Sequence, residues 1–252
     1  MDLGLRKKTA IVTGGAGGIG REIVKGLTGE GCNVCILDLN LTAAREAAES
    51  APRSQGARAI ALECDVTRRP SVEAAFAAAE KEFGDLHVLI NSHQLWPHAW
   101  FTDITDDQWR QTLDVNLTSY YLTCQAMVRS MLARGAQGSI LNISSQAAFR
   151  GATTGHAHYA AAKAGILGLT KSIAREVAGK GITVNALAPG MAWTPATEKT
   201  LKENLESYLE RIPLRRIAEP EEVAGVAIFL VSERARYMTG TTVDISGGML
   251  MR

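Results

Sequence analysis

Short apolar segments alternate with longer helical patterns along the whole of this 252-residue chain, and this alternation restricts the fold more than any other feature. The apolar segments are continuous, as in 34–37 (Val-Cys-Ile-Leu), with no polar residue at every second position. Continuous apolar strands are typical of a parallel sheet that helices cover on both faces. We predict strands at 9–13, 33–38, 59–64, 86–90, 139–143, 183–187 and 242–245, and helices at 19–27, 41–51, 72–83, 106–132, 159–178 and 221–230.

The regular succession of strands and helices predicts an α/β fold. We expect a single doubly wound Rossmann-type domain, with a seven-stranded parallel sheet flanked by helices on both faces. No Pro/Ser-rich linker, repeat or low-complexity segment divides residues 1–252, so one domain is expected to include them all. Residues 191–216 have no strand partner and are polar and helical in pattern. In this architecture they lie above the carboxyl ends of the strands, as a substrate lid or as a plain connection.

The charge balance and hydropathy exclude several classes of protein. Twenty-seven Lys and Arg against 26 Asp and Glu give a net charge of +1, which provides no electrostatic basis for binding nucleic acid or an anionic membrane. No apolar run approaches the roughly 18–20 residues that span a bilayer, and the N-terminus lacks the apolar core of a signal peptide. We expect a cytoplasmic protein that acts on a small molecule.

Four cysteines are too few for a disulfide scaffold in a chain of this length, and free thiols suit the cytoplasm. Cys32 and Cys35 form a C-x-x-C, but Cys35 lies within an apolar run and no second pair completes a zinc site. We interpret Cys35 as a residue of a buried strand and expect no metal.

A glycine cluster, 14–20 (Gly-Gly-Ala-Gly-Gly-Ile-Gly), follows the first predicted strand and opens the first predicted helix. Residues without Cβ allow a tight turn and let a pyrophosphate approach the free N–H groups of a helix N-terminus. In this position the cluster is a strong signal for a bound dinucleotide. We assign Gly14, Gly18, Ile19 and Gly20 to cofactor binding.

Asp38 ends the second predicted strand. A carboxylate at this point can accept hydrogen bonds from the adenosine ribose and repels a 2′-phosphate. No Lys or Arg lies in the glycine cluster, and none follows Asp38 before Arg45. The sequence therefore predicts NAD(H) in preference to NADP(H). The structural alternative for Asp38 is an N-cap of the next helix.

Tyr159 and Lys163 are four residues apart in a predicted helix, so both side chains lie on one face. A neighbouring cation favours the phenolate and brings the pKa of a tyrosine, ordinarily about 10, towards the range useful for general acid–base catalysis. Taken alone, such a pair is usually part of a solvated helix face.

Together with the glycine cluster, the Tyr-Lys pair makes the chain resemble the short-chain dehydrogenase/reductase family, and its 3-oxoacyl carrier-protein reductases in particular. The resemblance extends over essentially the whole chain and implies hydride transfer between a nicotinamide cofactor and an alcohol or ketone. The matching residues are Thr13-Gly14, Gly18-Ile19-Gly20, Asp65-Val66, Asn91, Asp114-Val115-Asn116, Asn142-Ile143-Ser144-Ser145, Tyr159, Lys163, Asn185, Pro189-Gly190 and Ser246-Gly247-Gly248.

The resemblance implies catalytic roles for four residues. Tyr159 would exchange a proton with the substrate oxygen, and Ser145 would donate a hydrogen bond to the carbonyl oxygen. Lys163 would lower the pKa of Tyr159 and bind the nicotinamide ribose. Asn116 would hold a water in a proton relay beyond Lys163; the alternative is that its amide only binds backbone groups.

The choice of serine is open at the level of sequence. Ser144 and Ser145 both end the predicted strand, whereas the usual family spacing falls on Gln146. We choose Ser145, and attribute the shift to one extra residue within 151–155.

The resemblance also implies contacts to the cofactor. Asp65 and Val66 would lie against the adenine and Asn91 on the adenosine side. Pro189-Gly190 would line the nicotinamide end, and Thr194 would touch the carboxamide.

The chain departs from the family after the fourth predicted strand. Where the family usually has Asn-Asn-Ala-Gly, this sequence reads Asn91-Ser92-His93-Gln94. The two larger side chains are expected to reshape the pocket near the nicotinamide or to weaken cofactor binding.

Aromatic and polar side chains gather in the segments expected beside the substrate. Such a mixture suits a sugar, a polyol or a ring-bearing ketone. His156 and His158 have no neighbouring carboxylate or Cys in the sequence, so we do not expect them to bind a metal. The pocket candidates are His93, Gln94, Trp96, Gln146, Arg150, His156 and Trp193.

The leading hypothesis is an NAD(H)-dependent oxidoreductase that interconverts a secondary alcohol and a ketone. The first alternative is a 3-oxoacyl carrier-protein reductase, an activity that usually goes with NADPH and with a basic patch for the acidic carrier. The second is a protein that binds NAD without turnover because His93 and Gln94 close the site. The resemblance further implies a homotetramer, with subunits packed through the helices at 106–132 and 159–178.

Overall fold

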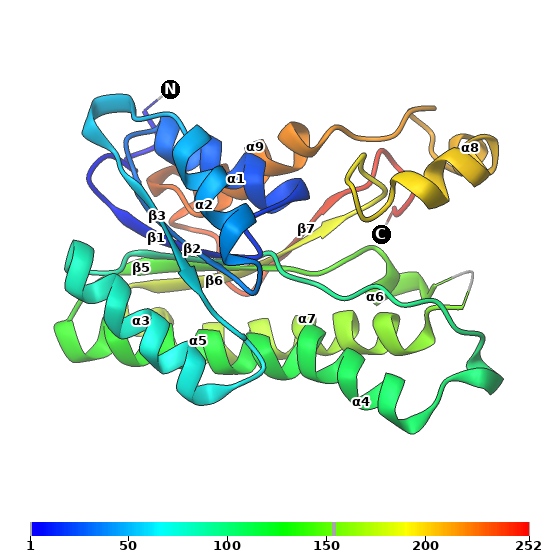
Figure 1. The fold of residues 1–252 in the computed structure, drawn as a ribbon, viewed down its shortest axis with the longest axis horizontal. Coiled ribbons are helices and arrows are strands. Elements are labelled where there is room, and N and C mark those ends of the chain that lie inside the picture. Colours follow the sequence, from blue (N-terminus) through cyan, green and yellow to red (C-terminus); the bar gives the residue numbers. More distant parts are fainter. Residues whose placement is uncertain (1, 153–154, 252) are drawn as a thin grey trace.

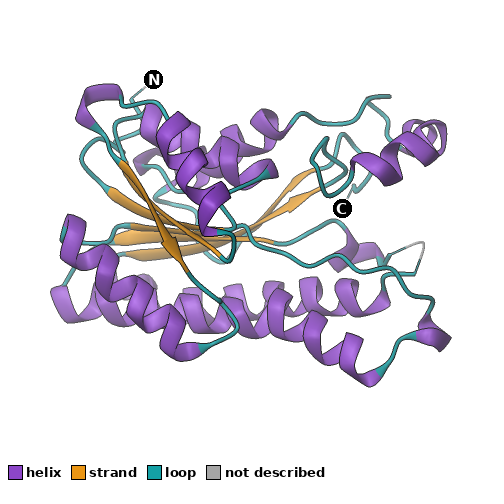
Figure 2. Cartoon of the chain, in the orientation of Figure 1, coloured by secondary structure: helices purple, strands orange, loops and turns teal. Residues whose placement is uncertain are grey.

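All seven strands form one parallel sheet. The computed structural model describes residues 2–152 and 155–251, and the strand order is β3-β2-β1-β4-β5-β6-β7. Figure 2 shows the sheet between two layers of helices. The strands are β1 (Thr9–Thr13), β2 (Asn33–Asp38), β3 (Ala59–Glu63), β4 (Val88–Asn91), β5 (Gly138–Ile143), β6 (Ile182–Pro189) and β7 (Thr242–Ile245).

Successive residues of each strand point to opposite faces of the sheet, and each face has its own core. On β1, Val12 packs with helices α1, α2 and α9, whereas Ile11 packs with α3, α5 and α7. Figure 1 shows these two layers above and below the sheet. The helices are α1 (Gly18–Gly29), α2 (Leu41–Ser50), α3 (Arg69–Phe83), α5 (Ser119–Arg134), α7 (Ala157–Val177) and α9 (Pro220–Leu230). The doubly wound Rossmann-type fold is confirmed.

The helix predicted at 106–132 is divided in the structure. An α-helix, α4 (Asp106–Leu113), leads into a π-helical turn (Asp114–Thr118) before α5 begins. Asn116 lies in this turn, and its amide is bonded to the backbone of Leu95 and Thr112. Hydrophobic periodicity could not predict the wider turn, because an apolar pattern does not distinguish a π turn from an α turn.

Residues 191–216 contain helix α8 (Glu198–Arg211), as the helical pattern predicted. The segment is joined to the body of the protein by a bridge between Ala192 and Ala218. Leu201 and Ile212 of the segment form a small core with Ile217, and Met249 packs against it from the chain after β7. The short helix α6 (Ala147–Arg150) follows β5, near the carboxyl ends of the strands (Figure 1).

The four cysteines are buried and unpaired. Cys35 lies within β2, as interpreted from the sequence, and Cys32 immediately precedes that strand. Within residues 2–152 and 155–251, no helix is long and apolar enough to cross a membrane. In the same part of the chain, no group of three or more His, Cys, Asp or Glu is placed to hold a metal ion.

The turn between β1 and α1 requires glycine at position 20. A Cβ on Gly20 would lie 2.2 Å from the carbonyl oxygen of Gly14, which is main chain and cannot move aside cheaply. At Gly29, the last residue of the same helix, a Cβ would meet nothing within 4 Å. The two positions therefore offer a matched test of the turn.

We expect Gly20→Ala to lower the free energy of unfolding by on the order of 1–3 kcal/mol, because the added methyl group displaces backbone. Gly29→Ala is expected to leave stability unchanged or slightly raised, since alanine has the higher helix propensity. Urea unfolding of the two variants measures the difference. Equal stabilities would show that the turn accommodates a side chain at position 20.

Candidate active site

A cavity of about 630 Å³ lies along the carboxyl edge of the sheet, from the glycine turn to Tyr159 and the start of residues 191–216. This is the position where ligands bind in doubly wound folds, since the strand order reverses between β1 and β4. The predicted site residues that line it are Gly14, Gly18, Ile19, Gly20, Asp38, Asp65, Val66, His93, Gln94, Trp96, Ser145, Gln146, Arg150, His156, Tyr159, Pro189, Gly190 and Thr194.

Four predicted site residues, Asn91, Trp193, Asn116 and Lys163, lie outside the cavity lining. For Asn91 and Trp193 the structure shows where the side chains lie instead. The side chain of Asn91 is buried behind the sheet edge, where it accepts from Thr123 Oγ1 (2.8 Å) and donates to Asn142 Oδ1 (2.9 Å). Trp193 packs on the small core of residues 191–216, beside Leu201 and Ile212. Neither side chain therefore lines the cavity.

Asn116 is also outside the lining, and its amide is fully used by the backbone. Its Oδ1 accepts from Leu95 N (3.0 Å), and its Nδ2 donates to Leu95 O (2.8 Å) and Thr112 O (3.1 Å). This is the alternative that the sequence left open for Asn116. The side chain fixes the loop after β4 onto the π-helical turn.

The glycine turn has the properties of a phosphate site. Helix α1 begins at Gly18, and no side chain caps its N-terminus, so its first N–H groups stay free for an anion. A Cβ on Gly17 would point into open space, and one on Gly18 would lie 3.3 Å from Thr194. The turn thus fits the pyrophosphate of a dinucleotide, with Thr194 on the opposite side.

Asp38 lies at the edge of this cavity, and its carboxylate is engaged by the main chain. Oδ2 accepts from the N–H of Ala16 (3.2 Å) and Oδ1 from the N–H of Asn40 (3.0 Å). The N-cap of α2 is Asn40, which accepts from Ala43 N (3.1 Å), and not Asp38. Asp38 therefore fastens the glycine turn to the end of β2.

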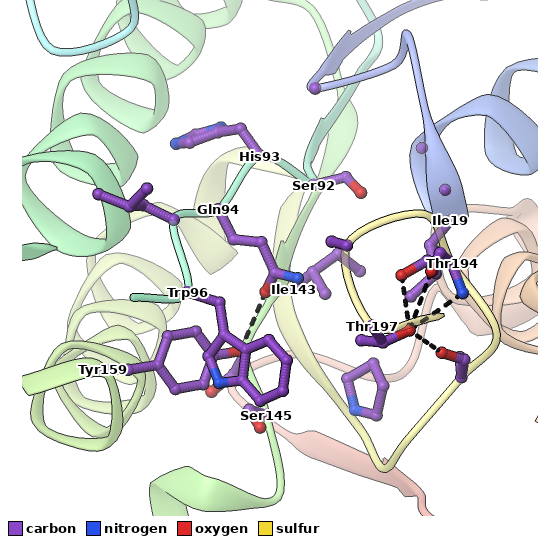
Figure 3. A pocket seen from close by; sticks show the side chains of 18 of the residues that line it. Ile19, Ser92, His93, Gln94, Trp96, Ile143, Ser145, Tyr159, Thr194 and Thr197 are labelled. Carbon is purple, nitrogen blue, oxygen red and sulfur yellow. Dashed lines mark hydrogen bonds between the residues drawn. The ribbon is translucent and has the colours of Figure 1, made fainter. Parts of the chain in front are cut away.

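The side chains of Tyr159, Ser145 and Gln94 lie close together in the cavity (Figure 3). The Tyr159 hydroxyl donates to Gln94 Oε1 at 2.9 Å. Burial raises the pKa of Tyr159 to about 12, and a hydrogen bond with Ser145 opposes the rise. Ser144 is buried and donates instead to the carbonyl of Lys163 (2.8 Å), so the geometry favours Ser145 as the serine of the site.

Lys163 is fully buried on the same helix, outside the cavity lining. Its Nζ donates to the carbonyl of Ile143 (2.9 Å) and to the hydroxyl of Tyr120 (3.2 Å), and lies 5.6 Å from the ring centroid of Tyr159. Burial lowers the pKa of Lys163 to about 7. The ammonium is thus close to Tyr159 but is held by other groups.

The two residues that depart from the family pattern point in different directions (Figure 3). The imidazole of His93 enters the interior, where it contacts Thr13 Oγ1 and Ser119 Oγ, each at 2.6 Å. Of these two residues, only Gln94 contacts the hydroxyl of Tyr159. The bulk expected near the nicotinamide therefore comes chiefly from Gln94.

Trp96 and His156 form the outer wall near Tyr159. Their rings stack with centroids 4.7 Å apart, and the His156 Nδ1–H donates to the carbonyl of Pro97 (2.7 Å). The His98 ring stands edge-on to His156 at 5.3 Å. This wall is aromatic and closely packed.

Sequence reasoning missed several residues of the site. Tyr208 and Arg211 line the cavity and are three residues apart on α8, so their helical spacing in the polar segment was a usable signal. Met249, after β7, also lines it, and nothing in the sequence pointed there. Tyr120 contacts Lys163 from α5 and was likewise not identified.

Known proteins resemble this chain over nearly its whole length. A family model described as enoyl-(acyl carrier protein) reductase matches residues 14–250. The 3-oxoacyl-[acyl-carrier-protein] reductase FabG of Chlamydia trachomatis is 37% identical over 246 residues, which are 97% of this chain and 98% of that protein. The chain belongs to the short-chain dehydrogenase/reductase family. FabG of Aquifex aeolicus is 36% identical over 249 residues, 99% of this chain and 100% of that protein.

Solved structures of the family agree in fold. A short-chain type dehydrogenase/reductase from Mycobacterium marinum matches with a TM-score of 0.95 at 28% identity, covering 100% of this chain and 98% of that one. A putative 2-deoxy-D-gluconate 3-dehydrogenase from Agrobacterium tumefaciens, with bound NADP, matches with a TM-score of 0.90 at 33% identity, covering 100% and 99%. The protein is a short-chain oxidoreductase that acts on a CH–OH or keto group.

The prediction of NAD(H) in preference to NADP(H) is wrong. The FabG reductases that this chain resembles use NADPH, and the similar A. tumefaciens structure holds NADP. The sequence argument assigned the Asp38 carboxylate to the ribose, whereas in the structure it binds two backbone N–H groups. The hydrogen bond of the Asp38 carboxylate to the glycine turn accounts for an acidic residue at this position, which therefore does not identify the cofactor.

The substrate prediction also changes. The names of the similar curated proteins support the first alternative, a 3-oxoacyl carrier-protein reductase, better than a polyol or sugar dehydrogenase.

Gln94 provides a direct test of this site. Gln94→Ala removes the acceptor that the Tyr159 hydroxyl has to leave before it can bond a substrate. Because one exchanged hydrogen bond is worth roughly 1 kcal/mol, KM for a keto substrate is expected to fall about five-fold, with little change in kcat. Gln94→Glu keeps an acceptor and adds charge, so its KM is expected to rise. A higher KM for Gln94→Ala in steady-state kinetics would show that the amide helps to bind substrate.

Proposed function

We propose that this protein reduces the keto group of a 3-oxoacyl thioester, carried on an acyl carrier protein, with NADPH as the hydride donor. Support comes from full-length relatives of that name at 36–37% identity. The dehydrogenases named after sugars or polyols among the similar structures are 30–33% identical. Two cationic side chains on the cavity wall, Arg150 and Arg211, are compatible with an acidic carrier at the entrance.

The observation that carries the proposal is the position of the Gln94 amide. Its carbonyl oxygen accepts the hydrogen bond of the Tyr159 hydroxyl at 2.9 Å, at the end of a cavity that begins at the glycine turn. A keto oxygen is the same kind of acceptor, so it can take the place of the amide at Tyr159. Ser145, in contact with the same hydroxyl, is then available as the second donor.

The catalytic roles follow from these contacts. When bound, NADPH supplies a hydride, two electrons and a hydrogen nucleus, to the keto carbon. Tyr159 transfers its hydroxyl proton to the keto oxygen, so the C=O bond becomes an alcohol. Ser145 donates a hydrogen bond to that oxygen while negative charge develops on it. The nearby Lys163 ammonium stabilises the phenolate left on Tyr159.

The dinucleotide would be held along the lining of the cavity. The free N–H groups at Gly18 to Gly20 would bind its pyrophosphate, and Asp65 and Val66 would contact the adenine. Pro189, Gly190 and Thr194 would border the nicotinamide. Asn116 would act indirectly, because its amide fixes the backbone of Leu95 beside Gln94.

Residues 191–216 would form a lid over this site. Thr194 and Thr197 from its first part and Tyr208 and Arg211 from α8 all face the cavity. The segment is held to the rest of the chain by its bridge to Ala218 and by a small core that it shares with Ile217 and Met249. Its closure would remove water from the reacting groups.

The test is the oxidation of NADPH, followed by its absorbance, with a short 3-oxoacyl thioester as substrate and with NADH in parallel. We expect turnover with NADPH. Tyr159→Phe is expected to lower kcat by about 10²–10⁴-fold, the usual contribution of a general acid, with NADPH still bound as judged by its fluorescence. Full activity of this variant would rule out Tyr159 as the proton donor, and higher kcat/KM with NADH would refute the proposed cofactor.

We also propose that the protein is a cytoplasmic homotetramer, as the family resemblance implies. The four buried free thiols suit a reducing compartment. On α7, the exposed residues Ala161, Ala164 and Gly168 are small enough for a helix of another subunit to approach closely. Ala164→Arg is expected to dissociate the tetramer in sedimentation at micromolar concentration, whereas Lys171→Arg is not. A monomeric wild-type protein would contradict this proposal.

A further inference from the structure

A buried tyrosine, Tyr120, lies directly behind Lys163. Both side chains are fully buried. The hydroxyl of Tyr120 accepts from Lys163 Nζ (3.2 Å) and lies 3.0 Å from two carbonyl oxygens, of His93 and of Ile143, to which it can donate. Lys163 Nζ donates to the same Ile143 carbonyl at 2.9 Å. Tyr120 therefore joins Lys163 to the loop after β4 and to the end of β5.

The side chain of His93 fixes the carbonyl that Tyr120 contacts. Ser119 donates its hydroxyl proton to the Val115 carbonyl (2.6 Å), so its oxygen has to accept from Nε2–H of His93. Nδ1 then accepts from the Thr13 hydroxyl (2.6 Å). This assignment, which follows from the hydrogen-bond network, satisfies both ring nitrogens of a neutral imidazole.

No carboxylate compensates the charge of Lys163 in residues 2–152 and 155–251. The groups around its ammonium are the phenols of Tyr120 on α5 and Tyr159 on α7, the imidazole of His93, and the Ile143 carbonyl of β5. Burial, with repulsion from Lys163, lowers the pKa of His93 to about 3, so its ring is neutral at pH 7. Burial likewise raises the pKa of Tyr120 well above its ordinary value, so it is a neutral phenol. The ammonium is held by neutral oxygen acceptors alone.

We propose that Tyr120, supported by His93, is a positioning residue that keeps the Lys163 ammonium charged and in place beside Tyr159. This gives a role to the His93 departure from the family sequence, since its bulk fills the interior next to Tyr120 (ring centroids 4.6 Å apart). The proposal rests on the family's reaction, in which Lys163 supports the phenolate of Tyr159. Only its kinetic test needs the proposed thioester substrate.

The chemical consequence is a shift in the protonation of Lys163. A hydroxyl that accepts from an ammonium stabilises its charged form. Removing that hydroxyl lowers the pKa of Lys163, which burial has already brought to about 7. Reduction needs the charged lysine, so the rate falls as pH rises through this pKa. In a variant without the hydroxyl the fall begins at a lower pH.

The matched variants are Tyr120→Phe and Tyr121→Phe, adjacent residues of α5. Tyr121 is 42% exposed, and its hydroxyl accepts only from Arg69 and Gln125 among the described contacts, away from Lys163. In the pH profile of kcat, we expect the fall on the alkaline side to occur at a pH lower by on the order of one unit in Tyr120→Phe. The loss at pH 8 is then about tenfold, shrinking below pH 6, with KM nearly constant. Tyr121→Phe is expected to keep the wild-type profile.

A readout without substrate separates this proposal from the proposed function. The Nζ resonance of Lys163 in protein labelled with [15N]lysine, assigned by its absence from Lys163→Arg, titrates directly. It is expected to titrate at lower pH in Tyr120→Phe than in Tyr121→Phe. Coincident titrations, or coincident kinetic limbs, would overturn the role of Tyr120. If the wild type, Tyr120→Phe and Tyr121→Phe all fail to turn over the thioester while the shift is still seen by NMR, only the proposed substrate is refuted.

If Tyr120→Phe does not fold, Ser119→Ala provides the second variant. It removes the acceptor of His93 Nε2–H and so loosens the carbonyl that Tyr120 contacts, while Tyr120 itself is kept. We expect a smaller shift of the Lys163 titration in the same direction. An unchanged titration would refute the supporting role of His93.

Discussion

Because all seven strands run parallel, their carboxyl ends meet at one edge of the sheet, and every functional element of this protein depends on that edge. The glycine turn follows β1, Asp38 ends β2, the His93-Gln94 segment follows β4, and Ser145 follows β5. Strand order reverses between β1 and β4, so connections leave that point in opposite directions and a cavity opens between them. The parallel sheet alone therefore brings residues that are distant in sequence together at the site.

The sequence predicted the parts of the protein that depend on local pattern. Continuous apolar runs indicated each strand of the sheet, and the helical pattern of residues 191–216 indicated α8. Glycine at positions 14 and 20 could be related to a tight turn because only a residue without Cβ fits there. Motif order indicated the family, and of the two serines that follow β5 the sequence analysis chose Ser145, the one in contact with Tyr159.

What the sequence could not provide is the direction of individual side chains. Asn91 ends a strand, and only the packing of α5 determines that its amide turns to Thr123 instead of the cavity. Asp38 has the residue type and position expected for ribose recognition, yet its carboxylate is taken by main-chain N–H groups. The hydrogen bond between Lys163 and Tyr120 likewise joins residues of two different helices that are 43 positions apart in the chain. Such contacts depend on three-dimensional packing, and no periodicity signals them.

The π-helical turn at Asp114–Thr118 has a consequence for the length of the chain. A π turn takes up one residue more than an α turn, so the surplus is absorbed locally and the helices on either side keep their relative phase. The fold could therefore lose one residue at this point and still align α4 with α5. The amide of Asn116, however, would no longer reach the backbone of Leu95. The number of residues between α4 and α5 is thus determined by the active-site loop, and helix packing alone would permit a shorter chain.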